Sequence, residues 1–196
     1  MNKLWTFGDS FTKGLGLYPD EHQYPEYKGK EDLIWCNLLA NYLNVDLELV
    51  AFNGISNDMI WDNILDKWDD INAGDYVIIG LTKLPRWQRY EPGHPQVGLF
   101  NKTPVRDTQL LGDAHTNSAV LENIRENIED VYLNVMTNFI FLTDRFKDKG
   151  CKTYMWDTTL WTKFKAIYQE TNHADHHWSV EGNQQMVDHI KKEMKL

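Results

Sequence analysis

The sequence predicts an α/β domain of the three-layer α/β/α type, in which helices cover both faces of a central parallel sheet of four to five strands. Short apolar runs alternate along the whole chain with segments whose apolar residues recur at helical spacing. Strands that are separated by helices pair in parallel through right-handed crossovers. The 196 residues, 42% of them hydrophobic, suffice for one compact domain over residues 1–196, without an internal repeat or a linker.

The first strand and the turn behind it organise the candidate site. An apolar run that begins at Leu4 breaks at Gly8-Asp9-Ser10. Because ligands of open parallel α/β sheets bind where the chain leaves the carboxyl end of a strand, the Ser10 hydroxyl lies where a reacting group is expected. The same three residues also favour turns, so a strand end without any chemistry explains them too. Ser10 is therefore a candidate nucleophile whose partners have to come from elsewhere in the chain.

The elements that follow are expected in the order helix, strand, helix, strand. Apolar residues at helical spacing predict a helix over 31–43, and residues 45–52 alternate acids with Val and Leu, as a strand near the sheet edge does. A second helix follows, with Ser56 or Asn57 as its N-cap. The most apolar run of the chain, 76–82, predicts a central strand that is buried on both faces.

Residues 83–117 show no clear period and are rich in Pro and Gly. A segment of this length without regular structure is usually functional, so we expect a lid or specificity loop over the site. Trp87, Arg89 and Tyr90 are candidate substrate-binding residues, because flat aromatic rings suit sugar rings and arginine suits hydroxyls and carboxylates. The same side chains could instead hold the loop against the domain, and the sequence leaves both interpretations open.

The last third of the chain predicts one long helix or two joined ones, then a strand and a closing helix. Residues 119–149 carry the apolar residues of the first, Gly150 stops it, and residues 151–156 are the strand. An irregular segment then reaches His177. The closing helix follows, with Ser179 as its N-cap.

Composition argues against several classes of function. The formal net charge of -9, with the 20 Lys and Arg residues scattered, argues against a nucleic-acid partner. The two cysteines, Cys36 and Cys151, show no metal-binding spacing and are expected to be buried and reduced. No apolar run approaches a membrane span and the first residues carry no secretory signal, so we expect no membrane partner and a cytoplasmic location, with association with a virus particle as the alternative. The oligomeric state stays open.

A second group of residues, Asp175-His176-His177-Trp178-Ser179, can supply partners for Ser10. An acyl-transfer site needs a nucleophile, a base for its proton, a group that orients the base and donors for the oxyanion. His177 can reach Ser10 if its loop folds back to the carboxyl edge of the sheet. Asp175 lies two residues earlier, so in an extended segment its carboxylate can point the same way and orient the imidazole. The backbone amides of Ser10 and Gly54 are candidate oxyanion donors.

These motifs resemble those of the SGNH, or GDSL-like, hydrolase superfamily. The four blocks of that family are matched, in the family's order and over essentially the whole chain, by Gly8-Asp9-Ser10, by Gly54 with Ser56-Asn57, by Gly80-Leu81-Thr82 and by Asp175 to Gly182. The resemblance implies a flavodoxin-like, three-layer α/β/α hydrolase fold with a serine nucleophile and no metal or other cofactor.

Two positions depart from the family pattern. The third block usually supplies an asparagine side chain to the oxyanion hole, and the matching residue here is Thr82, whose hydroxyl we expect to take that role. The last block is usually Asp-x-x-His, whereas here one residue separates Asp175 from His177, and Trp178 follows. This form resembles the Asp-x-His-Trp signature of SGNH-like polysaccharide O-acetyltransferases and related proteins.

Other assignments of the histidines stay open at this point. Glu170 and His173 have the acid-x-x-His spacing and form the rival pair. His173, His176 and His177 beside Asp175 could suggest a metal site, but they are bunched locally and no second group of ligands accompanies them. The resemblance implies catalysis without a metal.

The function expected from the resemblance is that of a serine esterase with Ser10, His177 and Asp175 as its triad. It would hydrolyse a small acyl ester, most directly an acetyl ester, so that the reaction on a carbohydrate would be a deacetylation. An O-acyltransferase that uses the same site is one alternative. A catalytically silent carbohydrate-binding or assembly module that has kept the fold is the other, and the missing asparagine at Thr82 keeps it open.

Overall fold

The computed structural model describes residues 2–19, 23–82, 87–90, 102–105 and 128–196 of the chain. At 87–90, 102–105, 128, 129 and 131 it describes the backbone alone. Most of the loop expected over 83–117 therefore lies outside the described residues. No helix in the described ranges is both long and apolar enough to cross a membrane.

Four parallel strands form the central sheet, in the order β2-β1-β3-β6. They span Lys3–Gly8 (β1), Asp46–Ala51 (β2), Tyr76–Gly80 (β3) and Lys152–Trp156 (β6). The chain moves from β1 to β2 on one side and then to β3 on the other, so the direction of the crossovers reverses beside β1. In open α/β sheets this reversal opens a crevice at the carboxyl ends of the strands, and Ser10 follows β1 at that point.

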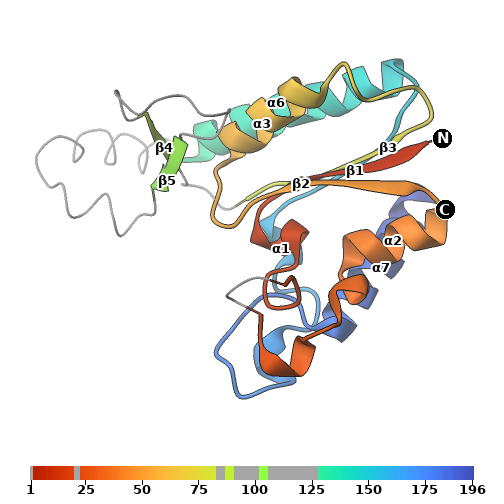
Figure 1. Ribbon diagram of the computed structural model, residues 1–196. Coiled ribbons are helices and arrows are strands. Elements are labelled where there is room, and N and C mark those ends of the chain that lie inside the picture. Colours follow the sequence, from red (N-terminus) through yellow and green to blue (C-terminus); the bar gives the residue numbers. More distant parts are fainter. Residues whose placement is uncertain (1, 20–22, 83–86, 91–101, 106–127) are drawn as a thin grey trace, which may run out of the picture.

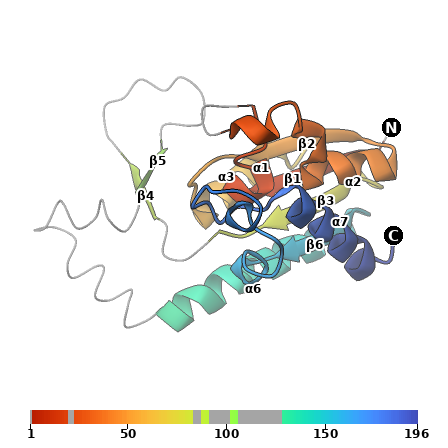
Figure 2. The same ribbon diagram turned by 90° about the horizontal axis from the view of Figure 1, so that it is seen from below.

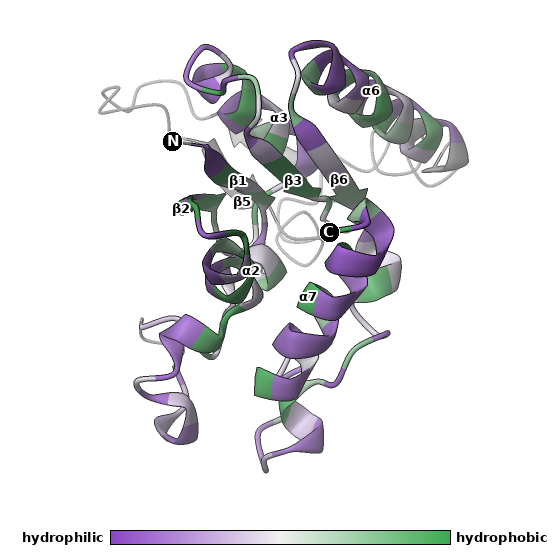
Figure 3. Ribbon diagram, turned by 90° about the vertical axis from the view of Figure 1, so that its right-hand side faces the viewer, coloured by the Kyte–Doolittle hydropathy of each residue, from purple (hydrophilic) through white to green (hydrophobic). Residues whose placement is uncertain are grey.

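Two layers of helices enclose the sheet, which confirms the expected three-layer α/β/α class (Figure 1). The helices α2 (Trp35–Leu43) and α7 (Val180–Met194) cover one face. The other face is covered by α3 (Asn57–Lys67) and α6 (Ile128–Asp148). The outer sides of α2 and α7 are mostly hydrophilic, as an amphipathic helix on a sheet requires (Figure 3).

The strands alternate their side chains between two separate cores. In β1, Leu4 packs with the α2 and α7 side, whereas Trp5 and Phe7 pack with the α3 and α6 side. In β3, Ile78 joins the first core and Val77 and Ile79 join the second. All of these side chains are buried, which is why β3 is an almost uninterrupted apolar run.

The helix ends follow from capping side chains. Ser56 rather than Asn57 caps α3, and Ser179 caps α7 by accepting from the amide of Gly182 at 3.2 Å. The helix expected over 31–43 begins only at Trp35, because the backbone at Ile34 is extended and residues 31–33 form a separate 3₁₀ turn. Asn183 of α7 caps this late start, since its side-chain oxygen accepts from the Trp35 amide at 3.0 Å.

Within the segment expected to be irregular, the structure contains a pair of strands. Trp87–Tyr90 (β4) pairs antiparallel with Lys102–Val105 (β5), with Trp87 opposite Val105. The absence of a clear sequence period hid this pair, because strands of four residues are too short to show one. The pair lies beyond the carboxyl edge of the central sheet (Figures 1 and 2).

Replacing Asn183 by Ala should lower the free energy of unfolding by about 2 to 3 kcal/mol, because the buried Trp35 amide and the Trp178 carbonyl lose their partner. Urea titration of the variant measures the loss. Gln184→Ala on the exposed side of the same helix is the matched control and should change the free energy of unfolding by less than about 0.5 kcal/mol. Equal losses in the two variants would show that the Asn183 cap does not stabilise the fold.

Candidate active site

Ser10 lies directly behind β1 as the first residue of a one-turn helix, α1 (Ser10–Lys13). Asp9 caps this turn by accepting from the Phe11 amide at 3.0 Å. The turn sits so close to the sheet that a Cβ on Gly8 would come within 2.0 Å of the Thr12 hydroxyl, and a Cβ on Gly80 would come within 2.6 Å of it. Glycine at both strand ends is therefore what allows the turn to hold Ser10 over the carboxyl edge.

His177 reaches Ser10 from the other end of the chain. Its Nε2 lies 2.8 Å from Ser10 Oγ, and its Nδ1 lies 2.6 Å from Asp175 Oδ1. A carboxylate only accepts, so Nδ1 carries the proton and Nε2 is left to accept from the serine hydroxyl. The ring also packs against Phe11, with the ring centroids 4.6 Å apart. The structure thus brings the three residues of the expected triad into one line of hydrogen bonds.

The carboxylate of Asp175 accepts hydrogen bonds on both oxygens. Oδ1 also accepts from the backbone amide of His177 at 2.8 Å, and Oδ2 accepts from the Tyr24 hydroxyl at 2.7 Å. Burial by itself would raise the pKa of Asp175, but the hydrogen bonds from the side chain and backbone of His177 and from Tyr24 outweigh it and lower the pKa to about 2. Burial, followed by the bond to Asp175 and nearby negative charge, raises the pKa of Tyr24 to about 12. Asp175 is therefore ionised and Tyr24 neutral over the working range of most enzymes.

A short antiparallel contact holds the segment that carries the histidine and the acid. The backbone amide of Ile167 donates to the His177 carbonyl at 2.8 Å, and that of Tyr168 donates to the Asp175 carbonyl at 2.9 Å. On the next residue pair, the Ser179 amide donates to the Lys165 carbonyl at 2.9 Å. The segment 157–179 lies beside α1 at the carboxyl end of the sheet (Figures 1 and 2).

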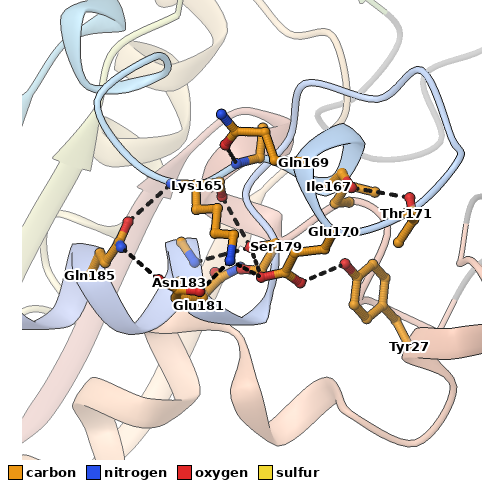
Figure 4. A network of polar contacts seen from close by, with 12 residues as sticks. Tyr27, Lys165, Ile167, Gln169, Glu170, Thr171, Ser179, Glu181, Asn183 and Gln185 are labelled. Carbon is orange, nitrogen blue, oxygen red and sulfur yellow. Dashed lines mark hydrogen bonds and ion pairs between the residues drawn. The ribbon is translucent and has the colours of Figure 1, made fainter.

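The rival pair, Glu170 and His173, is engaged elsewhere. Glu170 accepts from Tyr27 at 3.0 Å and from Ser179 Oγ at 2.8 Å, and Lys165 Nζ lies 3.7 Å from it (Figure 4). His173 lies 3.0 Å from Glu26 and stacks on Tyr24. The histidine that hydrogen-bonds Ser10 is His177.

The third histidine of the motif, His176, packs on Tyr168, with ring centroids 4.8 Å apart. In the described part of the chain, no group of three or more His, Cys, Asp or Glu side chains could hold a metal ion.

Thr82 differs from the role expected for it. Its hydroxyl donates to Asp9 Oδ2 at 2.7 Å, so its single proton is directed to the cap of α1 rather than to an oxyanion. Its backbone is held by Asn57, whose side chain accepts from the Thr82 amide at 2.9 Å and donates to the Thr82 carbonyl at 3.1 Å. Thr82 therefore connects the end of β3 to the turn of Ser10.

The two backbone donors expected for the oxyanion lie at neighbouring strand ends. Ser10 supplies the first amide of α1, a position whose N–H has no partner within its helix. Gly54 follows β2 in a turn and has a φ of 74°, the left-handed region that favours glycine. The β1 and β2 ladder continues up to this turn, because the Phe52 amide donates to the Gly8 carbonyl at 3.2 Å.

The strand β4 contains the candidate substrate-binding residues Trp87, Arg89 and Tyr90, and the structure describes their backbone but not their side chains. Their role in substrate binding stays a prediction.

Two other residues of the site were missed by sequence reasoning. Asn57 was considered only as a cap and as part of the glycine block. Tyr24 has no predicted role, because nothing in the sequence around it or around Asp175 marks the hydrogen bond that joins them.

Thr82→Val should lower the free energy of unfolding by about 1 to 3 kcal/mol, because the buried Asp9 carboxylate loses a donor. Thr82→Ser keeps the hydroxyl and should recover most of the loss. Chemical denaturation of the three proteins measures the difference. A valine variant as stable as the wild type would mean that the bond to Asp9 does not support the turn.

The low pKa of Asp175 predicts a pH dependence of stability. An Asp has an ordinary pKa of 3.8, so the unfolded chain binds the proton first, and the stabilisation is present above that pH and is lost as the pH falls toward about 2. The loss attributable to Asp175 should be about 2 kcal/mol. Denaturation of wild type and Asp175→Asn at pH 5 and pH 2.5 measures it, since the asparagine variant should lose less. Parallel pH profiles of the two proteins would contradict the assignment.

Comparison with known proteins yields similarity only at the level of structure. No protein-family model matches the chain, and no curated protein matches it. Among solved structures, it is similar to a protein assigned to the lipolytic G-D-S-L family from Desulfitobacterium hafniense DCB-2, with 12% identity, a TM-score of 0.40 and coverage of 98% of this chain and 99% of that one.

Two further solved structures are similar. One is a carbohydrate esterase whose active site is described as having divergent catalytic and non-catalytic binding functions, with 12% identity, a TM-score of 0.45 and coverage of 99% of this chain and 68% of that one. The other is a member of the lipolytic G-D-S-L family from Veillonella parvula DSM 2008, with 13% identity, a TM-score of 0.40 and coverage of 98% and 97%. At these identities and TM-scores the similarities carry no argument about family or function, so the function has to be argued from the geometry of the site itself.

Proposed function

We propose that this protein is a serine esterase in which Ser10 is the nucleophile, His177 the general base and Asp175 the acid that orients the base. The observation that carries the proposal is the continuous line of bonds from Ser10 Oγ through both nitrogens of His177 to Asp175, at 2.8 Å and 2.6 Å. The location of these three residues supports the proposal too. Ser10 follows the carboxyl end of β1, where the direction of the crossovers reverses, and this is where ligands bind in open α/β sheets.

The reaction follows from where the protons lie. His177 Nε2 takes the Ser10 proton while Oγ attacks the ester carbonyl, and the imidazolium that forms is stabilised by the ionised Asp175 beside Nδ1. Nε2 then returns the proton to the leaving alcohol, which breaks the ester bond and leaves the acyl group on Ser10. In the second half, His177 takes a proton from water as the water oxygen attacks the acyl carbonyl. His177 then gives that proton to Ser10 Oγ while the bond between Oγ and the acyl carbon breaks, so that the carboxylic acid leaves and the free serine is restored.

We assign the oxyanion to the backbone amides of Ser10 and Gly54. Both follow the carboxyl ends of adjacent strands, and an N–H directed at the developing charge is the usual donor in such a site. Thr82 is not part of this assignment, because its hydroxyl proton goes to Asp9. The turn of Ser10 is thus supported by the residue that the family pattern would place in the oxyanion hole.

For the substrate we propose a small acyl ester, with an acetyl group on a carbohydrate as the class to test first. The support is the Asp175-x-His177-Trp178 form of the last block, which resembles the signature of SGNH-like O-acetyltransferases and related proteins. Transfer to a second sugar hydroxyl in place of water would use the same acyl-enzyme. The two reactions differ only in which nucleophile His177 activates.

The test is hydrolysis of p-nitrophenyl acetate and of acetylated xylan by wild type and by Ser10→Ala and His177→Ala. Each variant should lose roughly 10³-fold or more in kcat, because each removes one member of a unit that acts together. His176→Ala is the matched control, since this neighbouring histidine packs on Tyr168 and should keep near wild-type activity. Mass spectrometry of the protein after treatment with a fluorophosphonate should show the adduct on Ser10.

Several outcomes would contradict the proposal. Full turnover by Ser10→Ala, or equal losses in His176→Ala and His177→Ala, would remove the assigned roles. A folded wild type that neither hydrolyses esters nor accepts the fluorophosphonate would favour a silent carbohydrate-binding module. Acetyl transfer to an added sugar in preference to water would make the protein an acyltransferase.

A further inference from the structure

We propose that Tyr24 is a positioning residue of this site, which holds the Asp175 carboxylate in the orientation that His177 requires. The inference rests on the proposed function of the triad. Tyr24 OH lies 2.7 Å from Asp175 Oδ2, whereas His177 occupies Oδ1 through both Nδ1 and its backbone amide. With donors fixed on both oxygens, the carboxylate cannot turn about its Cβ–Cγ bond without breaking a bond to a charged group.

Tyr24 is itself held in place by its neighbours. Its ring stacks on His173, with the centroids 4.0 Å apart and the planes 18° from parallel. The Nε2 of His173 lies 3.0 Å from Glu26, two residues from Tyr24. The backbone amide of Tyr24 donates to the carbonyl of Gly16 at 3.3 Å. A donor whose ring and backbone are both fixed can impose its own position on the carboxylate that it binds.

A tyrosine also suits the electrostatics of this position. The Asp175 carboxylate is needed ionised, because its charge stabilises the imidazolium that forms when His177 takes the serine proton. A Lys or Arg at the same place would orient the carboxylate but would also neutralise its charge. The Tyr24 hydroxyl donates without adding charge, and burial and the nearby acids keep it protonated by raising its pKa to about 12.

The chain around Tyr24 makes a second hydrogen bond of the same kind. Tyr27, three residues later, donates to Glu170 Oε2 at 3.0 Å, so it also links this part of the chain to the segment 157–179, which carries Asp175 and His177. The contacts of Glu170 in the described part of the chain go to Tyr27, Ser179 Oγ and Lys165 (Figure 4). If the two tyrosines only fastened the loop, their hydroxyls would be equivalent. If Tyr24 positions the triad acid, only its hydroxyl affects the reaction.

The experiment compares Tyr24→Phe with Tyr27→Phe, each of which removes one hydroxyl and keeps the ring. Tyr24→Phe should lower kcat for p-nitrophenyl acetate about tenfold and leave KM unchanged, because the lost bond orients the base rather than the substrate. Tyr27→Phe should keep kcat, whatever its effect on thermal stability. Active-site titration with a fluorophosphonate counts the folded sites in each preparation.

A second measurement does not depend on turnover. The proton on His177 Nδ1 lies in the short bond to Asp175 and should give a resolved downfield ¹H NMR signal, assigned by its absence from His177→Ala. That signal should move in Tyr24→Phe and stay in place in Tyr27→Phe. Unchanged kcat and an unmoved signal in Tyr24→Phe would overturn the inference, and so would equal kcat losses in both variants or a Tyr24→Phe protein that does not fold.

If wild type hydrolyses no ester, the proposed function fails, and the NMR signal alone decides the inference about Tyr24. A signal that moves only in Tyr24→Phe supports its hold on Asp175. A signal that stays in place overturns it.

Discussion

The backbone contact between residues 165–168 and 175–179 is the constraint on which the site depends. The His177 carbonyl accepts a hydrogen bond from the Ile167 amide, and the Asp175 carbonyl accepts one from the Tyr168 amide. The main chain of both residues is thus held by bonds other than those of their side chains. A Cβ on Gly182 would lie 2.0 Å from the carbonyl of Lys165, which shows how closely this segment lies on the first turn of α7. The Ser179 cap then joins the anchored segment to a long helix of the core.

A second set of bonds joins the strand ends that face this segment. Asp9 caps α1 and accepts from Thr82 behind β3, and Asn57 at the start of α3 pairs with the backbone of Thr82. These three residues are all at least nine-tenths buried, where an unmet polar group is costly. The turn that carries Ser10, the start of α3 and the end of β3 are therefore connected by one polar network.

Most of the fold could be predicted from the sequence because its signals are local. The apolar run of β3, the serine cap of α7 and the break after β1 each depend on a few adjacent residues. The contact between Ser10 and His177 could be predicted because a parallel sheet places the carboxyl ends of all its strands on one edge. The bond between Tyr24 and Asp175 joins residues 151 apart and leaves no mark on the sequence around either of them. Thr82 was located correctly by its block, but the partner of its hydroxyl depends on side-chain packing, which a motif does not contain.

The two glycines beneath Ser10 limit which substitutions this part of the fold can accept. Gly8 faces the Thr12 side chain and Gly80 faces both Thr12 and Trp156, each at less than a van der Waals distance from any added carbon. An alanine at either position would require compensating changes in α1 or in β6. A single substitution of either glycine is therefore expected to disturb the fold. Proteins that share this arrangement should then differ mainly in the segments beyond the sheet edge, while glycine is kept at the two positions beneath Ser10.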